Sequence, residues 1–185
     1  MDGKRYVLTD GTSDTLLALV TASTQDKGSV VAVNNPYLQI GFLLGSYYVE
    51  TGDNQNAVRA LDAGLVRPGV LIGDMGDMLP MLLMERGTAL GQLKRHADAV
   101  ASYERVIAMV NLPPALKAGA LRGRANNLID LGRLDEAEAD LRASLQISPN
   151  HPLALNELKY IEELRAGKSK TDSVVKKFDP GTQPN

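Results

Sequence analysis

The residues of this chain whose types could carry chemistry do not converge. Its two histidines, His96 and His151, lie far apart in the sequence. Because a metal site needs about four convergent ligands, we expect surface or capping roles for both. The acidic run DEAEAD at 135–140 could pair carboxylates, but its helical placement favours a solvated face. The tripeptide GKS at 167–169 lacks the upstream glycine of a phosphate-binding loop. We therefore expect no catalytic residue, no metal, no cofactor and no enzyme activity.

The composition also argues against several classes of partner. A net charge of −2 provides no basic field for nucleic acid, and two phenylalanines, six tyrosines and no tryptophan offer few stacking platforms. No apolar run approaches the ~18 residues of a membrane span. The chain has no cysteine, which excludes disulfides and thiolate ligands. This usage fits the cytoplasm or, if a leader has been removed, the periplasm. We expect neither a nucleic-acid partner nor a membrane span.

Residues 121–149 read as two helices joined by a turn. The first helix places apolar residues at i, i+4 and i+7, a helical spacing, at Leu121, Ala125 and Leu128. Gly132 interrupts the pattern and Pro149 ends it. Between them a second helix carries its apolar face on Leu134, Ala137, Leu141 and Leu145. The stretch therefore predicts a helical hairpin.

The same order of residues occurs at 83–114 and at 41–69. In each copy a small residue of the first helix precedes a small residue of the second by twelve positions; the pairs are Gly45–Ala57, Gly87–Ala99 and Ala125–Ala137. Small side chains let helix backbones approach closely while leucines fill the flanking space. We expect each pair to lie opposite one another where the two helices meet.

Three in-phase helical hairpins of this length resemble tetratricopeptide repeats. The resemblance implies an all-α fold: a right-handed α-solenoid of three helix-turn-helix repeats plus a C-terminal capping helix, with a short irregular or mixed N-terminal segment. We divide the chain into an N-terminal segment at 1–36, a repeat domain at 37–166 and a disordered tail at 167–185. Within the domain we place repeats at 38–71, 80–113 and 118–151 and the cap at 152–165, with an apolar stripe on Leu155, Leu158 and either Ile161 or Glu162.

The copies depart from the family pattern in several places. Gly41, Leu83 or Leu121 stands where a large aromatic residue is usual, and Lys94 replaces the turn glycine of the middle copy. The linkers are long, and at 70–79 we expect a short extra turn or a partly buried loop.

The segment before the first repeat does not follow its pattern. We expect a helix within SDTLLALVTAS at 13–23. The stretch 28–33 is either a strand pairing with 5–9 or an extended segment that covers the first hairpin.

Arg124 stands one position before the small residue of its helix, where leucine is common in the family. Asp140 lies on the part of the second helix that would face it. We predict an Arg124–Asp140 pair inside the hairpin, with a structural role.

Stacked hairpins of this family leave a concave surface lined mainly by the first helix of each repeat. The resemblance places a peptide-binding groove on Gln39, Phe42, Ser46, Val49, Met81, Met84, Thr88, Arg122, Asn126, Asn156 and Tyr160. Methionine adapts to apolar side chains, while Arg122 and Asn126 can meet a carboxylate or a main-chain carbonyl. In the alternative arrangement Met81 and Met84 pack inward or under 70–79.

Some members of the family hold the C-terminal carboxylate of a chaperone in a clamp of Lys, Asn and Arg. Phe42, Ser46 and Glu85 occupy the clamp positions of the first two repeats, and the Arg122–Asn126 pair resembles half of the clamp. The resemblance therefore disfavours a chaperone-tail ligand.

The leading interpretation is a protein-interaction module, a scaffold or adaptor, that binds a protein or peptide segment in this groove. The alternative is a self-associating, homo-oligomeric protein or an assembly subunit of a larger complex, without a dedicated groove.

The repeat register yields a direct prediction. Ala137→Glu buries a carboxylate without a partner at the helix–helix contact, so it should unfold much of the third hairpin. A thermal melt that this substitution leaves unchanged would contradict the register.

Overall fold

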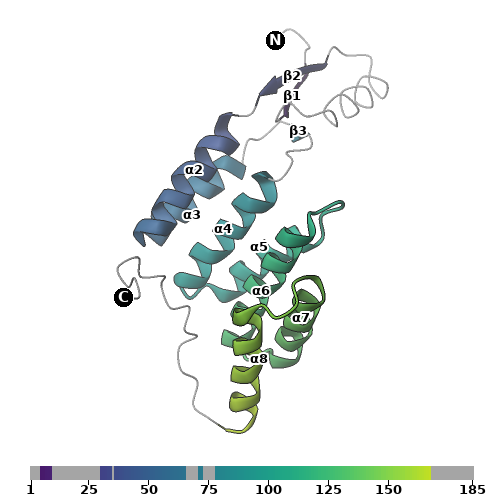
Figure 1. Cartoon of the computed structure of the whole chain (residues 1–185). Helices are drawn as coiled ribbons and strands as arrows, with labels where there is room; N and C mark the ends of the chain where they lie inside the picture. The colour runs from purple at the N-terminus through teal and green to yellow at the C-terminus, as the bar shows by residue number, and fades with distance from the viewer. Residues whose placement is uncertain (1–4, 10–29, 35, 66–70, 73–77, 168–185) are drawn as a thin grey trace, which may run out of the picture.

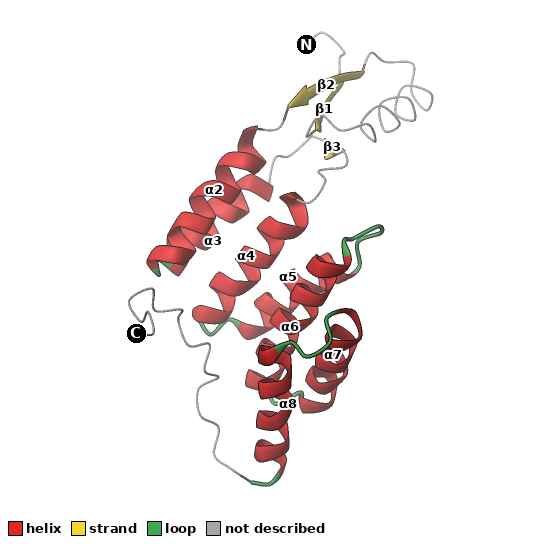
Figure 2. Ribbon diagram, in the orientation of Figure 1, coloured by secondary structure: helices red, strands yellow, loops and turns green. Residues whose placement is uncertain are grey.

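The computed structural model describes residues 5–9, 30–34, 36–65, 71–72 and 78–167. Seven α-helices dominate this part of the chain, and successive helices pair as hairpins that follow one another along the molecule (Figures 1 and 2). Their bounds are α2 Pro36–Thr51, α3 Asn54–Leu65, α4 Met78–Gln92, α5 His96–Ile107, α6 Pro114–Asp130, α7 Leu134–Ile147 and α8 Pro152–Arg165. The expected all-α solenoid of three hairpins and a capping helix is confirmed.

Three short strands lie beyond the first hairpin (Figure 1). Strands β1 (Arg5–Thr9), β2 (Val30–Asn34) and β3 (Leu71–Ile72) form a parallel sheet in the order β2-β1-β3. In its register Arg5 pairs with Val30 and Val7 with Leu71. At residues 71–72 the structure thus has a strand where we expected a turn or loop. The helix expected at 13–23 and the tail beyond 167 lie outside the described residues.

The turns inside the three hairpins share one backbone conformation. Gly52, Lys94 and Gly132 have φ values of 79°, 61° and 76°, in the left-handed region. Their amides donate to carbonyls three residues earlier, at 3.1, 2.9 and 2.9 Å. Lys94 therefore does the work of the glycine that the middle copy lacks, at a cost of about 1 kcal/mol for its side chain.

Glycines set the distance between the paired helices. A Cβ atom added to Gly45 would lie 2.4 Å from the side chain of Leu61, and one added to Gly87 would lie 2.6 Å from the ring of Tyr103. Ala57, Ala99 and Ala137 are fully buried. Each of these glycines therefore contacts the large residue one turn after the alanine that we expected opposite it. At Gly41 a Cβ would lie 2.7 Å from the Cα of Gly64, so no aromatic residue fits there.

Tyr103 also links the second hairpin to the third. The ring is 4% exposed, and a Cβ added to Gly123 of α6 would lie 2.4 Å from it. Since Gly87 lies on the other helix that the ring touches, Tyr103 packs against glycines of both α4 and α6.

Two partly buried arginines connect helices by ion pairs. Arg124 donates two hydrogen bonds, of 2.7 and 2.6 Å, to the carboxylate of Asp140, which confirms the predicted pair inside the third hairpin. Arg86 lies one repeat earlier and bridges two hairpins, because it donates to Asp62 of α3 at 2.6 Å and to Ser102 of α5 at 2.7 Å.

The capping helix α8 buries the predicted stripe except at its first position. Ala154 and Ile161 are buried and Leu158 packs against the same cluster, whereas Leu155 is exposed. The stripe therefore starts one residue earlier than expected. Arg165 fastens the other end of α8 to α7 through ion pairs with Asp135 and Glu138. No helix within the described ranges is long and apolar enough to cross a membrane.

The contact of Tyr103 with Gly123 is testable by a double-mutant cycle. Gly123→Ala should lower the free energy of unfolding by about 1–3 kcal/mol, because the methyl group overpacks a buried ring. Leucine occupies the equivalent positions 61 and 141, so in a Tyr103→Leu background the same substitution should cost much less. Urea unfolding of the four proteins measures the coupling, and costs that simply add would contradict the contact.

Candidate functional site

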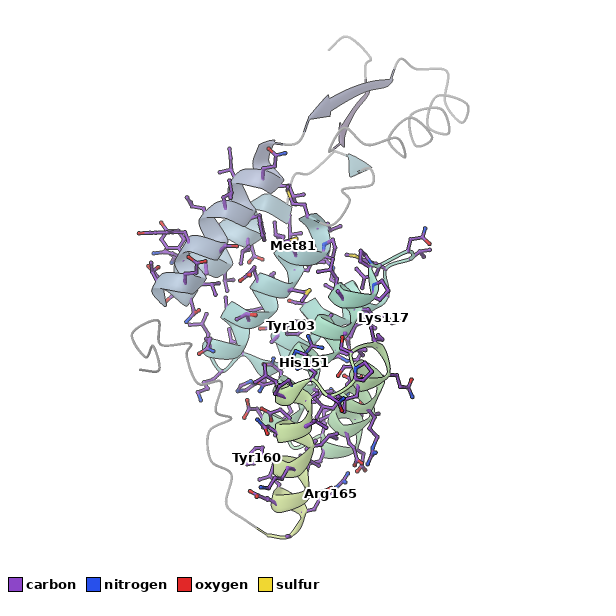
Figure 3. All side chains as sticks on the ribbon, in the orientation of Figure 1. Met81, Tyr103, Lys117, His151, Tyr160 and Arg165 are labelled. Carbon is purple, nitrogen blue, oxygen red and sulfur yellow. The ribbon has the colours of Figure 1, made fainter. Side chains whose placement is uncertain are left out.

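A cavity of about 810 Å³ opens between α4, α6 and α8. Six of the predicted groove residues line it, two from each helix: Met84, Thr88, Arg122, Asn126, Asn156 and Tyr160. The first helix of the second repeat, the first helix of the third and the cap thus face a common space. Figure 3 labels Tyr103 and Tyr160, which both line this space.

The remaining five predicted residues are not among those that line this cavity. Phe42 and Val49 are half-buried against the core between the first two hairpins. The Oγ of Ser46 is buried without a hydrogen-bond partner. Gln39 and Met81 are exposed. The first repeat therefore contributes no residue to the lining of this cavity, unlike in the expected groove. Much of α2 packs instead on α3 and α4.

Met84 lies in both of the arrangements considered for it, since it packs inward and also faces the cavity. Its side chain packs partly against the buried cluster around Tyr103, and it also lines the cavity. Its Cε would lie 2.9 Å from a Cβ added to Gly119, so that glycine makes room for it.

The cavity is also lined by residues that the sequence argument did not select. Tyr103, Gly119 and Gly123 line it beside Met84. The Tyr103 hydroxyl lies 3.1 Å from Oγ1 of Thr88, and burial raises the pKa of Tyr103 to about 12, although this hydrogen bond opposes the shift. In the sequence, the glycines at 119 and 123 lie four residues apart on one helix face. This spacing was the signal that could have predicted the close approach of other side chains to α6.

Arg122 has an unsatisfied donor in this cavity. Its Nη1 is buried and has no hydrogen-bond partner within the described part of the chain. Burial lowers the pKa of Arg122. The Nδ1 of His151, at the start of α8, is likewise buried without a partner, and burial and the charge of Arg122 lower the pKa of His151. A buried donor left unpaired costs about 1–3 kcal/mol, which an incoming acceptor would recover.

Carboxyl groups border the same cavity on the two outer helices. Burial and the charge of Glu50 raise the pKa of Glu85 on α4. Burial and the charge of Asp130 raise the pKa of Glu157 on α8, against a hydrogen bond from Asn126. Both carboxylates would therefore be stabilised by a nearby cation.

His96 has a structural position between two hairpins. Its Nδ1 lies 3.0 Å from Oδ1 of Asn127 and 3.5 Å from Oδ2 of Asp130, and Asn127 in turn donates to the carbonyl of Gly123. The histidine thus ties the start of α5 to α6 and is not a surface residue. Among the described residues no three His, Asp or Glu side chains are grouped to hold a metal ion.

The pKa of Glu85 gives a pH-dependent prediction. Because folding raises this pKa above its ordinary value of 4.5, the carboxyl destabilises the fold as the pH rises through the interval between the two values, and the loss is complete above the folded pKa. Glu85→Gln should therefore raise the melting temperature at neutral pH and have little effect well below pH 4.5. Glu50→Gln, which removes only the second cause, should give a smaller gain. An effect of Glu85→Gln that does not vary with pH would contradict this account.

Comparisons with known proteins agree with this architecture. Residues 84–152 match the family model described as "Tetratricopeptide repeat". No curated protein matches the sequence. The first repeat domain of Spaghetti (RPAP3) bound to the HSP90 peptide SRMEEVD has a TM-score of 0.58 at 24% identity, covering 72% of this chain and 97% of that one. The second domain of human RPAP3, in complex with the HSP70 peptide SGPTIEEVD, has a TM-score of 0.56 at 19% identity, covering 68% and 95%.

The matched segment spans the second and third hairpins, whose turns, glycine contacts and internal Arg124–Asp140 pair are described above. The likeness to the first of these solved domains covers 72% of this chain and shows the same fold. Residues 84–152 are therefore similar to the tetratricopeptide repeat family.

Proposed function

We propose that this chain is a non-enzymatic protein-interaction module that binds an extended peptide segment in the cavity between α4, α6 and α8. The observation that carries the proposal is the buried, unpartnered Nη1 of Arg122 within that cavity. A peptide carboxylate would satisfy it by a charge-assisted hydrogen bond, which is worth about 1.5–3 kcal/mol.

The charges around Arg122 suggest the order of residues in the peptide. Arg122 lines the cavity from α6. Glu85 lines it from α4 and Glu157 lines it from α8. An acidic residue at Arg122 with basic residues on either side would match all three groups. Met84, Leu153 and Tyr160 supply apolar surface along the same lining, which suits apolar side chains between the charged ones.

The similar solved domains support the kind of ligand. Two of them are described with bound chaperone peptides, SRMEEVD and SGPTIEEVD. This chain has Phe42, Ser46 and Glu85 at positions where the resemblance would place the Lys, Asn or Arg of the family's carboxylate clamp. We therefore propose a peptide of mixed charge rather than a chaperone tail.

Selection from a phage-displayed random peptide library tests the proposal. The wild-type protein should enrich peptides in which Asp or Glu is flanked by Lys or Arg. For a selected peptide, Arg122→Gln should weaken binding about tenfold to hundredfold, as expected for a lost charge-assisted hydrogen bond. Arg59→Gln, on an exposed arginine of α3, is the matched control and should leave the affinity unchanged.

Two results would overturn the proposal. One is a selected peptide that binds Arg122→Gln as tightly as the wild type. The other is a selection that enriches no peptide at all from a protein that is folded by circular dichroism.

A further inference from the structure

The outer face of α2 carries an uninterrupted stripe of large apolar side chains. Ile40, Leu43, Leu44 and Tyr47 follow the i, i+3, i+4, i+7 spacing of one helix face, and they are between 47% and 68% exposed. A soluble protein seldom leaves such a contiguous stripe in water without a use for it. We call these four residues the α2 stripe.

The other hairpins show what this face does elsewhere in the chain. With Gly45, Gly87 and Ala125 taken as equivalent, Ile40 corresponds to Leu82 and Ala120, and Tyr47 corresponds to Ala89 and Asn127. All four equivalents are buried. Leu82 and Ala89 pack against residues of the first hairpin, including Leu61, and Ala120 packs against residues of the second, including Tyr103. On α4 and α6, therefore, a preceding hairpin covers the positions of Ile40 and Tyr47. The positions of Leu43 and Leu44 are occupied there by Glu85, Arg86, Gly123 and Arg124, which are partly exposed.

The α2 stripe is thus an apolar helix face of the kind that packs on a neighbouring helix. Within the described residues no helix covers it. Figure 1 shows α2 at one end of the row of hairpins. A neighbour that covers it would have to present an apolar surface.

We infer that the α2 stripe is the interface of a homodimer, in which α2 helices of two copies pack antiparallel about a twofold axis. The spacing of the stripe is symmetric about the point between Leu43 and Leu44. An axis through that point sets Leu43 of one copy against Leu44 of the other, and Ile40 against Tyr47. Every residue of the stripe then meets another residue of the stripe, as a self-complementary interface requires.

The charge of α2 agrees with this arrangement. Glu50 is the only charged residue between Pro36 and Thr51, and it lies beyond the stripe. Two copies therefore bring no like charges together at the contact. Four side chains of one helix bury less than the ~800 Å² per partner that is common in stable interfaces, so the dimer should dissociate on dilution.

Dimerisation through α2 goes beyond peptide binding and does not depend on it. No residue of α2 lines the cavity between α4, α6 and α8, so the cavity of each copy would stay open. The dimer would present two such cavities, and a partner with two recognition segments would gain avidity.

Sedimentation velocity over a range of concentrations tests the inference on the full chain. The wild type should shift from monomer to dimer as concentration rises. Leu43→Glu should be monomeric at all concentrations, since it places two carboxylates beside the axis. Leu155→Glu, at another exposed leucine on α8, is the matched control and should dimerise as the wild type does. Circular dichroism melts establish that both variants are folded.

Cysteine cross-linking tests the direction of packing, and the chain has no cysteine of its own. A mixture of Ile40→Cys and Tyr47→Cys should form a mixed disulfide dimer on mild oxidation. Ile40→Cys alone should not, because antiparallel packing sets the two positions about 10 Å apart along the axis.

Three outcomes would overturn the inference. The first is a wild type that stays monomeric at all concentrations, as it would if residues of this chain outside the described ranges covered the stripe. The second is a dimer that survives Leu43→Glu. The third is efficient cross-linking of Ile40→Cys to itself, which would require parallel packing.

Discussion

The packing of Tyr103 against two glycines is the contact on which the central part of this molecule depends. The ring occupies space that Gly87 of α4 and Gly123 of α6 leave free, so one side chain sets the separation of three helices. The same ring lines the cavity, and its hydroxyl contacts Thr88. Overpacking a core also destabilises it, so the space around this ring tolerates little change. Because the ring lines the cavity, the contact that stacks the hairpins also shapes the surface that a partner would meet.

The arginines of α4 and α6 divide into two kinds. Arg86 and Arg124 are bound to carboxylates and hold helices together. Breaking the Arg124–Asp140 pair is costly because it leaves the buried charge of Asp140 uncompensated. Arg122, two residues before Arg124, instead keeps a buried donor without a partner. The fold supplies acceptors for its structural arginines, and this contrast is why Arg122 is the residue we assign to a ligand.

Much of the architecture was predictable because its signals are local. The twelve-residue offsets and the helical spacing around Gly132 predicted the hairpins, and the position of Arg124 predicted its pair with Asp140. The composition of the cavity was harder to predict. Whether α2 joins a common surface depends on the angle between hairpins, which is set by distant contacts such as Arg86 with Asp62. The placement of Tyr103 between two repeats, and the shift of the α8 stripe from Leu155 to Ala154, depend on the same inter-helix geometry.

The central claim is that the space between α4, α6 and α8 is where a peptide binds. Amide chemical-shift mapping by nuclear magnetic resonance, with a peptide selected by the wild-type protein, measures this directly. The account predicts that the largest shifts fall on Gly119, Arg122 and Gly123 of α6 and on Asn156 of α8. Shifts concentrated instead on α3, α5 and α7, with those α6 amides unmoved, would contradict it.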